Sequence, residues 1–123
     1  MNLSFSIEER KPVWMALSEF YLDTELSDNT FIHIAETFKK SPYSFAEIRE
    51  INKKEVFPLL QVNLLNVAGE WKGFDEEWLV TTILFTLEKQ NLKSFFFNKF
   101  YYIMFQNRNK SYWKKVQEIY NNL

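Results

Sequence analysis

Apolar residues recur at the spacing of an α-helix along most of this chain. They fall three and four positions apart, so each set lies on one side of a helix, whereas the residues of a half-buried strand would alternate. The four clearest sets are Val13, Trp14, Leu17, Phe20 and Tyr21; Phe31, Ile34, Ala35 and Phe38; Val56, Leu59, Leu60, Leu64 and Val67; and Tyr112, Trp113, Val116, Ile119, Tyr120 and Leu123. This periodicity predicts an all-α fold.

Two longer apolar segments indicate how the helices are arranged. Between Trp78 and Leu87 the apolar residues surround the helix almost completely, which predicts that this helix is the central, most enclosed element. Residues 94–105 are rich in Phe and Tyr, which favour strands, but Phe96, Phe97 and Phe100 also fit a helical stripe. An isolated strand would lack a partner, so we expect about six or seven helices around one aromatic-rich core.

Three positions carry the side-chain chemistry of a helix start. Ser44 is followed three residues later by Glu47, which predicts a capping box, and Ser27 and Asp75 are further N-caps. Glu76 and Glu77 then lie at the positive end of the helix dipole. These caps predict helices that begin near residues 28, 45 and 76.

Two prolines bear on the helix boundaries. Pro12 is expected near the start of the first helix, where its missing N–H does little harm. Pro58 either begins a new helix after a break near Lys53 and Lys54 or kinks a longer helix. We favour the break.

Composition and length predict a single helical domain that spans residues 1–123. The chain has no cysteine, which removes disulfides and thiolate metal sites and is compatible with a reducing cytoplasm. No linker or repeat divides it, and the opening residues lack the features of a secretory signal. Its apolar runs are shorter than the ~20 residues that a membrane-spanning helix needs. We therefore expect a cytoplasmic protein without membrane contact.

The segment from Asn63 to Asp75 holds the only two glycines of the chain, Gly69 and Gly73. Gly69 is placed to end one helix and Gly73 to turn the chain before the next, so one interpretation is a helix–helix corner with Trp71 in the core. The other is a partner-binding surface, because Trp is a frequent interface anchor. Its residues would be Glu70, Trp71, Asp75, Glu76 and Glu77.

Sequence motifs for catalysis and for cofactor binding are absent. No Gly-rich phosphate loop, nucleophile elbow or dinucleotide fingerprint occurs. His33 is the only histidine and has no partner at metal-ligand spacing, so we expect neither a metal site nor a cofactor. Asn63 shares a stripe with Leu59 and Leu60, where its amide would tie down the neighbouring turn or face a ligand pocket.

Charge is distributed unevenly along the chain. Residues 1–90 hold fifteen acids against nine bases, a net charge of −6, whereas residues 91–123 hold one acid against six bases, a net charge of +5. Basic residues interleaved with aromatic ones could grip a phosphate backbone and stack bases, which points to Lys110, Lys114 and Lys115. Alternatively, the basic helices dock on an acidic body within one fold.

Several segments resemble a family of small uncharacterised bacterial proteins. They are residues 10–18, 23–26, 41–44 and 55–58, and above all Asn-Leu-Leu-x-Val-Ala-Gly-Glu-Trp-x-Gly-Phe-Asp from Asn63 to Asp75, followed by Trp78 and Leu79. The resemblance covers roughly residues 8–90. It implies a small intracellular bacterial protein, and it transfers no catalytic residue because the family has no established activity.

These observations favour a non-catalytic protein-interaction module. Its specific form would be an immunity-type inhibitor of a cognate bacterial toxin, which presents the acids around Asp75 to a basic protein partner. The alternative is a nucleic-acid-binding protein that uses the basic, aromatic C-terminal segment.

Overall fold

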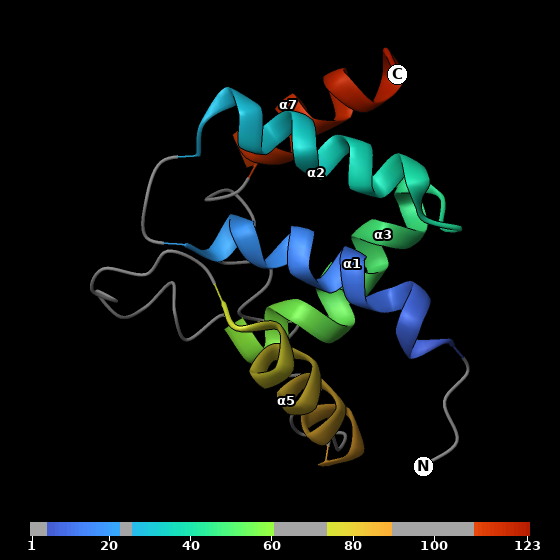
Figure 1. The fold of residues 1–123 in the computed structure, drawn as a ribbon, viewed down its shortest axis with the longest axis vertical. Helices are drawn as coiled ribbons and strands as arrows, with labels where there is room; N and C mark the ends of the chain where they lie inside the picture. The colour runs from blue at the N-terminus through green and yellow to red at the C-terminus, as the bar shows by residue number, and fades with distance from the viewer. Residues whose placement is uncertain (1–4, 23–25, 61–73, 90–109) are drawn as a thin grey trace.

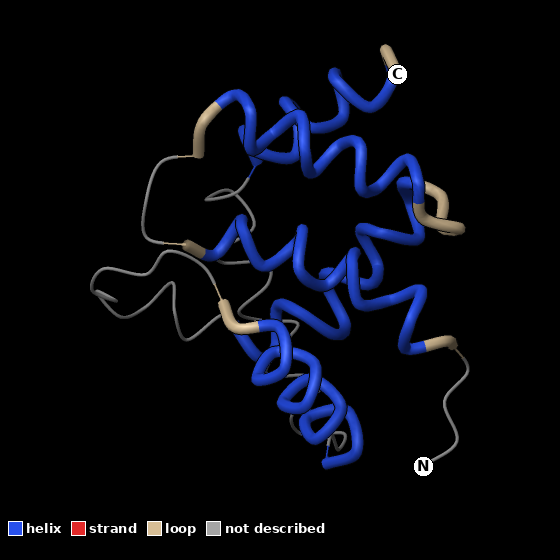
Figure 2. Tube along the Cα trace, viewed as in Figure 1, coloured by secondary structure: helices blue, strands red, loops and turns tan. Residues whose placement is uncertain are grey.

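The computed structural model describes residues 5–22, 26–60, 74–89 and 110–123, and every regular element within them is helical (Figures 1 and 2). These ranges contain five α-helices: α1 (Ile7–Ser18), α2 (Asp28–Lys40), α3 (Phe45–Ile51), α5 (Glu76–Lys89) and α7 (Lys110–Asn121). A 3-10 turn, η1 (Glu19–Tyr21), follows α1, and a π-helical turn, η2 (Asn52–Val56), follows α3. The all-α prediction is confirmed for this part of the chain. The expected total of six or seven helices and the helix at residues 94–105 depend on residues outside it.

The predicted helix caps are present as specific hydrogen bonds between side chains and backbone amides. The Ser44 hydroxyl accepts a bond from the Glu47 amide at 3.1 Å, and the Glu47 carboxylate accepts one from the Ser44 amide at 2.8 Å. The Ser27 hydroxyl accepts a bond from the Thr30 amide at 3.2 Å. Each bond satisfies an amide that the first turn of a helix leaves without a partner. Local sequence therefore fixes where α2 and α3 begin.

Pro12 and Pro58 both lie within helical backbone. Helix α1 begins at Ile7 with Ser6 as its cap, so Pro12 is inside the helix, further from its start than its sequence position suggested. The predicted break near Lys53 and Lys54 is wrong, because α3 continues through η2 into helical residues 57–60. In η2 the Phe57 amide bonds to the Asn52 carbonyl, five residues back, and this wider turn accommodates the proline that follows.

Helix α1 is the central element, and α5 lies at the periphery. In Figure 1, α1 crosses the middle of the molecule between α2 and α5. It packs against α2, α5 and η2, and its Val13, Trp14 and Leu17 are completely buried. The prediction that α5 is the most enclosed helix is wrong, since Trp78 is 47% exposed and Phe85 is 60% exposed. Apolar residues occur on every side of α5, but neighbouring elements do not cover every side of the helix.

Aromatic rings join α7 to the rest of the fold. Trp113 lies edge-on to Phe20 and Phe45, with ring centroids 4.9 and 5.8 Å away, and stacks near Phe38 at 6.1 Å. Tyr112 contacts Phe31 at 5.4 Å, so α7 packs along α2 as its apolar stripe predicted, except that Leu123 at the end of the stripe is exposed. The buried side chains of all the described helices form one hydrophobic cluster rich in aromatic residues.

Candidate functional site

The predicted partner-binding surface is described only in part. Asp75, Glu76 and Glu77 are exposed at the start of α5, as a charged docking surface requires. Glu70 and Trp71 lie outside the described residues, as do Asn63, Gly69 and Gly73. In the described part of the chain, the site consists of the first turn of α5 and its neighbours.

Asp75 organises the first turn of α5. Its carboxylate accepts a hydrogen bond from the Trp78 amide at 2.9 Å, and its carbonyl accepts the first helical bond, from the Leu79 amide, at 2.9 Å. The ring of Trp78 stacks on the buried ring of Phe74, with centroids 6.1 Å apart and an interplanar angle of 14°. The turn thus presents three acids beside an aromatic ring that is half exposed and held in place.

Asp75 should contribute to stability mainly as a cap. Replacing Asp75 with Ala should lower the free energy of unfolding by about 1 kcal/mol, because the amide at position 78 loses its partner. Asp75→Asn keeps a capping oxygen and should stay close to wild type in a urea titration. Equal losses in the two variants would contradict a capping role and point to the charge.

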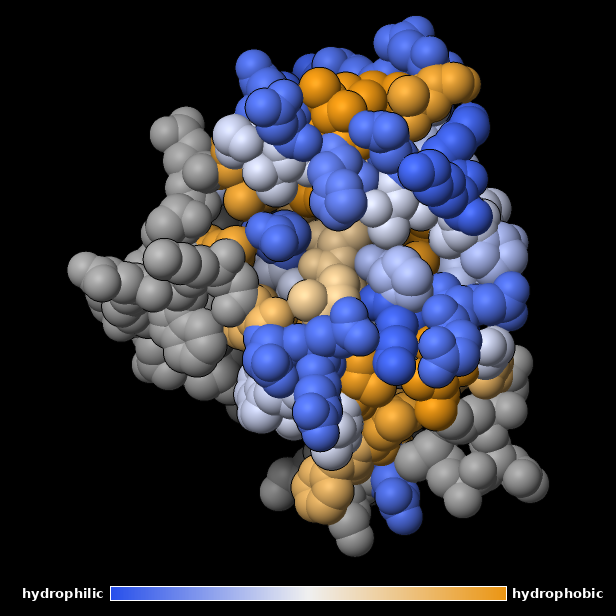
Figure 3. Space-filling model, in the orientation of Figure 1, coloured by the Kyte–Doolittle hydropathy of each residue, from blue (hydrophilic) through white to orange (hydrophobic). Residues whose placement is uncertain are grey.

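A hollow of about 450 Å³ adjoins this turn. It lies between α1, α2 and the start of α5, and Glu76 belongs to both features. Its lining combines charged side chains with an apolar floor: Glu8, Lys11, Pro12, Met15, Ala16, Glu19, His33, Thr37 and Glu76. Figure 3, which faces these helices, shows weakly hydrophobic surface in the centre of the view bordered by hydrophilic side chains. Glu8 and Glu19 line this hollow together with Glu76, so it adds two acids to those that the sequence indicated.

Glu19 has the most perturbed environment in the hollow. Burial raises the pKa of its carboxyl above the ordinary value, and the electrostatic interaction with His33 offsets part of that rise. Its carboxylate forms no hydrogen bond or ion pair with any residue that the structure describes. Near the N-terminal end of α1, the Glu8 carboxylate lies 3.6 Å from the Nζ of Lys11. Glu19 is therefore an acid in partly apolar surroundings that has no direct cationic partner among the described residues.

Sequence reasoning missed Glu8, Glu19 and the contribution of His33. A signal was present, since Glu8, Lys11, Met15 and Glu19 are spaced three to four residues apart and share one face of α1 and the η1 turn that follows it. That spacing defines a polar face but does not identify the helices opposite it. The proximity of His33 and Glu76 depends on the packing of α2 and α5 and could not be predicted from spacing.

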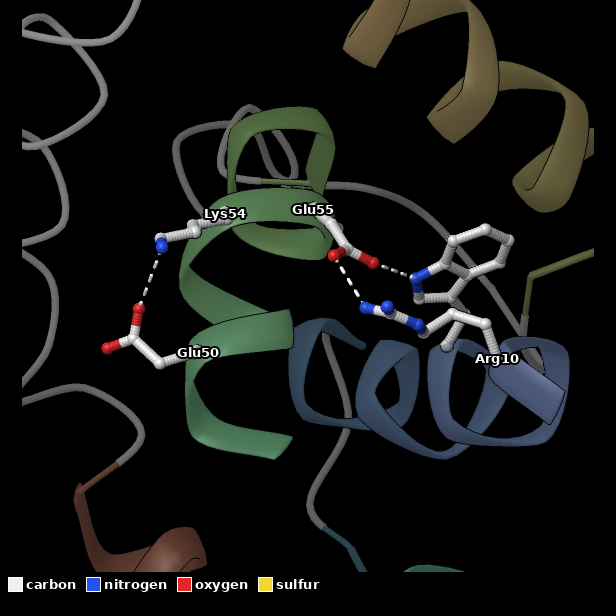
Figure 4. A network of polar contacts seen from close by, with 5 residues as sticks. Arg10, Glu50, Lys54 and Glu55 are labelled. Carbon is white, nitrogen blue, oxygen red and sulfur yellow. Dashed lines mark hydrogen bonds and ion pairs between the residues drawn. The ribbon is translucent and has the colours of Figure 1, made fainter. Parts of the chain in front are cut away.

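A buried polar network connects α1 to η2 (Figure 4). The Arg10 guanidinium donates to the Glu55 carboxylate at 2.6 Å, and the Trp14 indole donates to the other carboxylate oxygen at 2.8 Å. Phe5 and Tyr43 flank the guanidinium, with ring centroids 3.9 and 5.0 Å from Cζ. Burial raises the pKa of Glu55, although the bonds from Trp14 and Arg10 oppose the rise. The network is structural, because the Glu55 carboxylate joins Arg10 and Trp14 of α1 to η2, although the Nε of Arg10 is buried without a hydrogen-bond partner.

The basic residues proposed for nucleic-acid binding have mixed environments. Lys110, Lys114 and Lys115 are all exposed on α7. Lys115, however, forms an ion pair with Asp28 of α2 at 2.7 Å, and its hydrogen bond holds the pKa of that carboxyl below its ordinary value. Trp113 is buried and is therefore not available to stack with a base, and Tyr112 is partly buried against the core.

The described residues contain no cluster of side chains suited to metal binding. Within residues 5–22, 26–60, 74–89 and 110–123, no three His, Asp or Glu side chains group closely enough to hold an ion. None of the helices described there is both long and apolar enough to span a membrane.

The fold and the site define a small helical domain that carries an acidic, partly hollowed surface. The chain belongs to the DUF7079 family, a domain of unknown function, whose family model matches residues 8–119. This match extends past the region of resemblance noted in the sequence and includes α7. Neither a curated protein nor a solved structure matches the chain.

Proposed function

We propose that the protein is a non-catalytic interaction module that binds a basic protein partner through its acidic surface. This surface comprises Asp75, Glu76, Glu77 and Trp78, and Glu70 and Trp71 would extend it. The observation that carries the proposal is the half-exposed Trp78, fixed by Phe74 beside three consecutive exposed acids. The proposal takes the whole chain, residues 1–123, as one domain of six or seven helices.

The charges and the ring would have different roles in binding. Glu76 and Glu77 lie in the first turn of α5, where the positive end of the helix dipole stabilises a negative charge. They can therefore attract a basic partner without destabilising the helix. Trp78 loses little conformational freedom on binding because the stack with Phe74 already restricts it. Trp is enriched among the residues that contribute most to binding at protein interfaces, so Trp78 suits the role of an anchor.

In its specific form, the proposal is an immunity-type inhibitor of a cognate toxin in the bacterial cytoplasm. An acidic surface of this kind could occupy a basic active site or a basic nucleic-acid-binding face on such a toxin. A small domain without a catalytic motif suits that role. A toxin reading frame next to the gene would support it, and a neighbourhood without one in related genomes would weigh against it.

The proposal is tested by neutralising the two glutamates of the acidic surface. Glu76→Gln combined with Glu77→Gln should retain a basic protein from a lysate of the native host about tenfold less strongly than wild type, since attraction at the rim is lost. The readout is quantitative mass spectrometry of the captured proteins at low and high salt. Trp78→Ala should weaken the same interaction independently of salt.

A matched control variant changes the net charge by the same amount at positions away from the acidic surface. Glu88→Gln with Glu118→Gln neutralises two exposed acids at the far end of α5 and on α7. This variant should capture the partner as wild type does, and thermal melts should confirm that both variants are folded. Equal capture by all three proteins would contradict the proposal, as would turnover in a substrate screen by a protein that captures nothing.

Nucleic-acid binding through Lys110, Lys114 and Lys115 is the alternative. The net charge of +5 for residues 91–123 favours it, whereas the ion pair of Lys115 with Asp28 and the packing of Trp113 count against it. A mobility shift that weakens with salt and disappears with Lys114→Glu and Lys115→Glu would establish it. Unchanged migration of labelled DNA and RNA at low salt would exclude it.

A further inference from the structure

The hollow between α1, α2 and α5 has the charge to receive a cation. Three carboxylates line it, those of Glu8, Glu19 and Glu76, against Lys11 and His33 as bases. Lys11 already lies near Glu8 at 3.6 Å. The carboxylates of Glu19 and Glu76 form no ion pair with the described residues, and Glu76 also belongs to the first turn of α5.

Glu19 gives the hollow a specific point of attachment. Its carboxylate is half buried and forms no hydrogen bond or ion pair with the described residues, although burial of a charged group is costly without a partner. A donor that arrives from outside the chain would remove that cost. A ligand that carries a positive charge would gain a charge-assisted hydrogen bond to this carboxylate, whose charged form is disfavoured by partial burial.

The shape and the lining favour a guanidinium over an ammonium group. A guanidinium is planar and more weakly hydrated than an ammonium, so it enters a partly apolar space at lower cost. Its methylene stem can lie along apolar surface while the charged head reaches a carboxylate. The hollow supplies that surface through Pro12, the half-buried Met15 and the buried Ala16.

We propose that the hollow receives an arginine side chain of the basic partner, with the guanidinium on Glu19 and the methylene groups along Met15 and Ala16. The inference rests on the proposed function, because it takes the arginine to belong to a protein bound at the acidic surface. Glu76, which lines the hollow and belongs to that surface, makes the two sites continuous. The arginine would act as the central anchor and the first turn of α5 as the charged rim.

The test titrates the full chain with N-acetyl-arginine amide and follows backbone amide shifts by NMR. The amides of Met15, Ala16, Glu19 and His33 should shift together, whereas N-acetyl-citrulline amide, which has a similar shape without the charge, should leave them unchanged. Glu19→Gln should weaken the binding about tenfold, since a charge-assisted bond is lost. Glu36→Gln, an exposed acid of α2 outside the hollow, should bind as wild type does.

Three results would overturn the inference: equal shifts with arginine and citrulline, shifts that map to another surface, or wild-type affinity in Glu19→Gln. Binding of N-acetyl-lysine amide with the same affinity would overturn the choice of arginine. Capture of a basic partner without any response to the arginine compound would leave the proposed function standing and refute this inference. An arginine response from a protein that captures no partner would refute the proposed function instead, and with it the assignment of the arginine to a partner.

Discussion

Replacing Glu55 with Ala should lower the free energy of unfolding by about 3–5 kcal/mol, a large part of the stability of a domain of this size. The substitution leaves the Arg10 guanidinium, whose side chain is 10% exposed, buried without its carboxylate. The Trp14 indole loses its acceptor at the same time. Urea denaturation followed by circular dichroism measures the loss.

The chain provides a matched control for this prediction. Glu50 forms a similar ion pair with Lys54 at 3.4 Å, but both side chains are more than half exposed, and Glu50→Ala should change stability by no more than about 0.5 kcal/mol. Arg10→Met combined with Glu55→Leu should lose less than Glu55→Ala alone, because no charge remains unpaired. If Glu55→Ala cost no more than Glu50→Ala, the buried network would not have the role assigned to it.

Replacing Trp113 with Ala should cost about 3–5 kcal/mol, the usual range for removing a large aromatic ring from a core. The ring is 6% exposed and contacts Phe20, Phe38 and Phe45, which come from three separate segments. The Arg49 guanidinium also lies over it, with Cζ 4.7 Å from the ring centroid. Its removal therefore loosens α7 from the elements that it packs against.

Two measurements separate this effect from a general loss of stability. Amide hydrogen exchange should accelerate in α7 more than in α1, because the cavity lies where α7 docks. Lys114→Ala, at the exposed neighbouring position, should stay within about 0.5 kcal/mol of wild type. A stability loss below 1 kcal/mol in Trp113→Ala, or uniform exchange across the fold, would contradict the prediction.

Features that depend on neighbours in the sequence could be predicted. The caps at Ser27, Ser44 and Asp75 each need a side chain and an amide three residues away, so the sequence contains both partners. The buried side of α7 could be predicted for the same reason, because the spacing of its apolar residues along the sequence indicates which side of the helix packs against the core. The exposed acids of α5 also agree with expectation because charged residues in a first turn point to solvent.

Features that depend on tertiary packing could not be predicted in this way. Arg10 and Glu55 are 45 residues apart, and no spacing rule relates an arginine of one helix to a glutamate of another. The position of α5 was predicted wrongly because apolar composition reports what a helix could bury, not how many neighbours cover it. The hollow was missed for a related reason, since its acids come from α1, η1 and α5 and its histidine comes from α2.

The π-helical turn η2 also sets the rotational phase of the chain that follows it. A π turn holds about one residue more than an α turn, and each residue of an α-helix advances about 100° around the axis. With uninterrupted α-helical winding, Phe57 and Leu60, now 3% and 2% exposed, would rotate away from the core by about that angle. A relative that lacked one residue in this turn could wind as an uninterrupted α-helix and still direct the residues equivalent to Phe57 and Leu60 into the same interior.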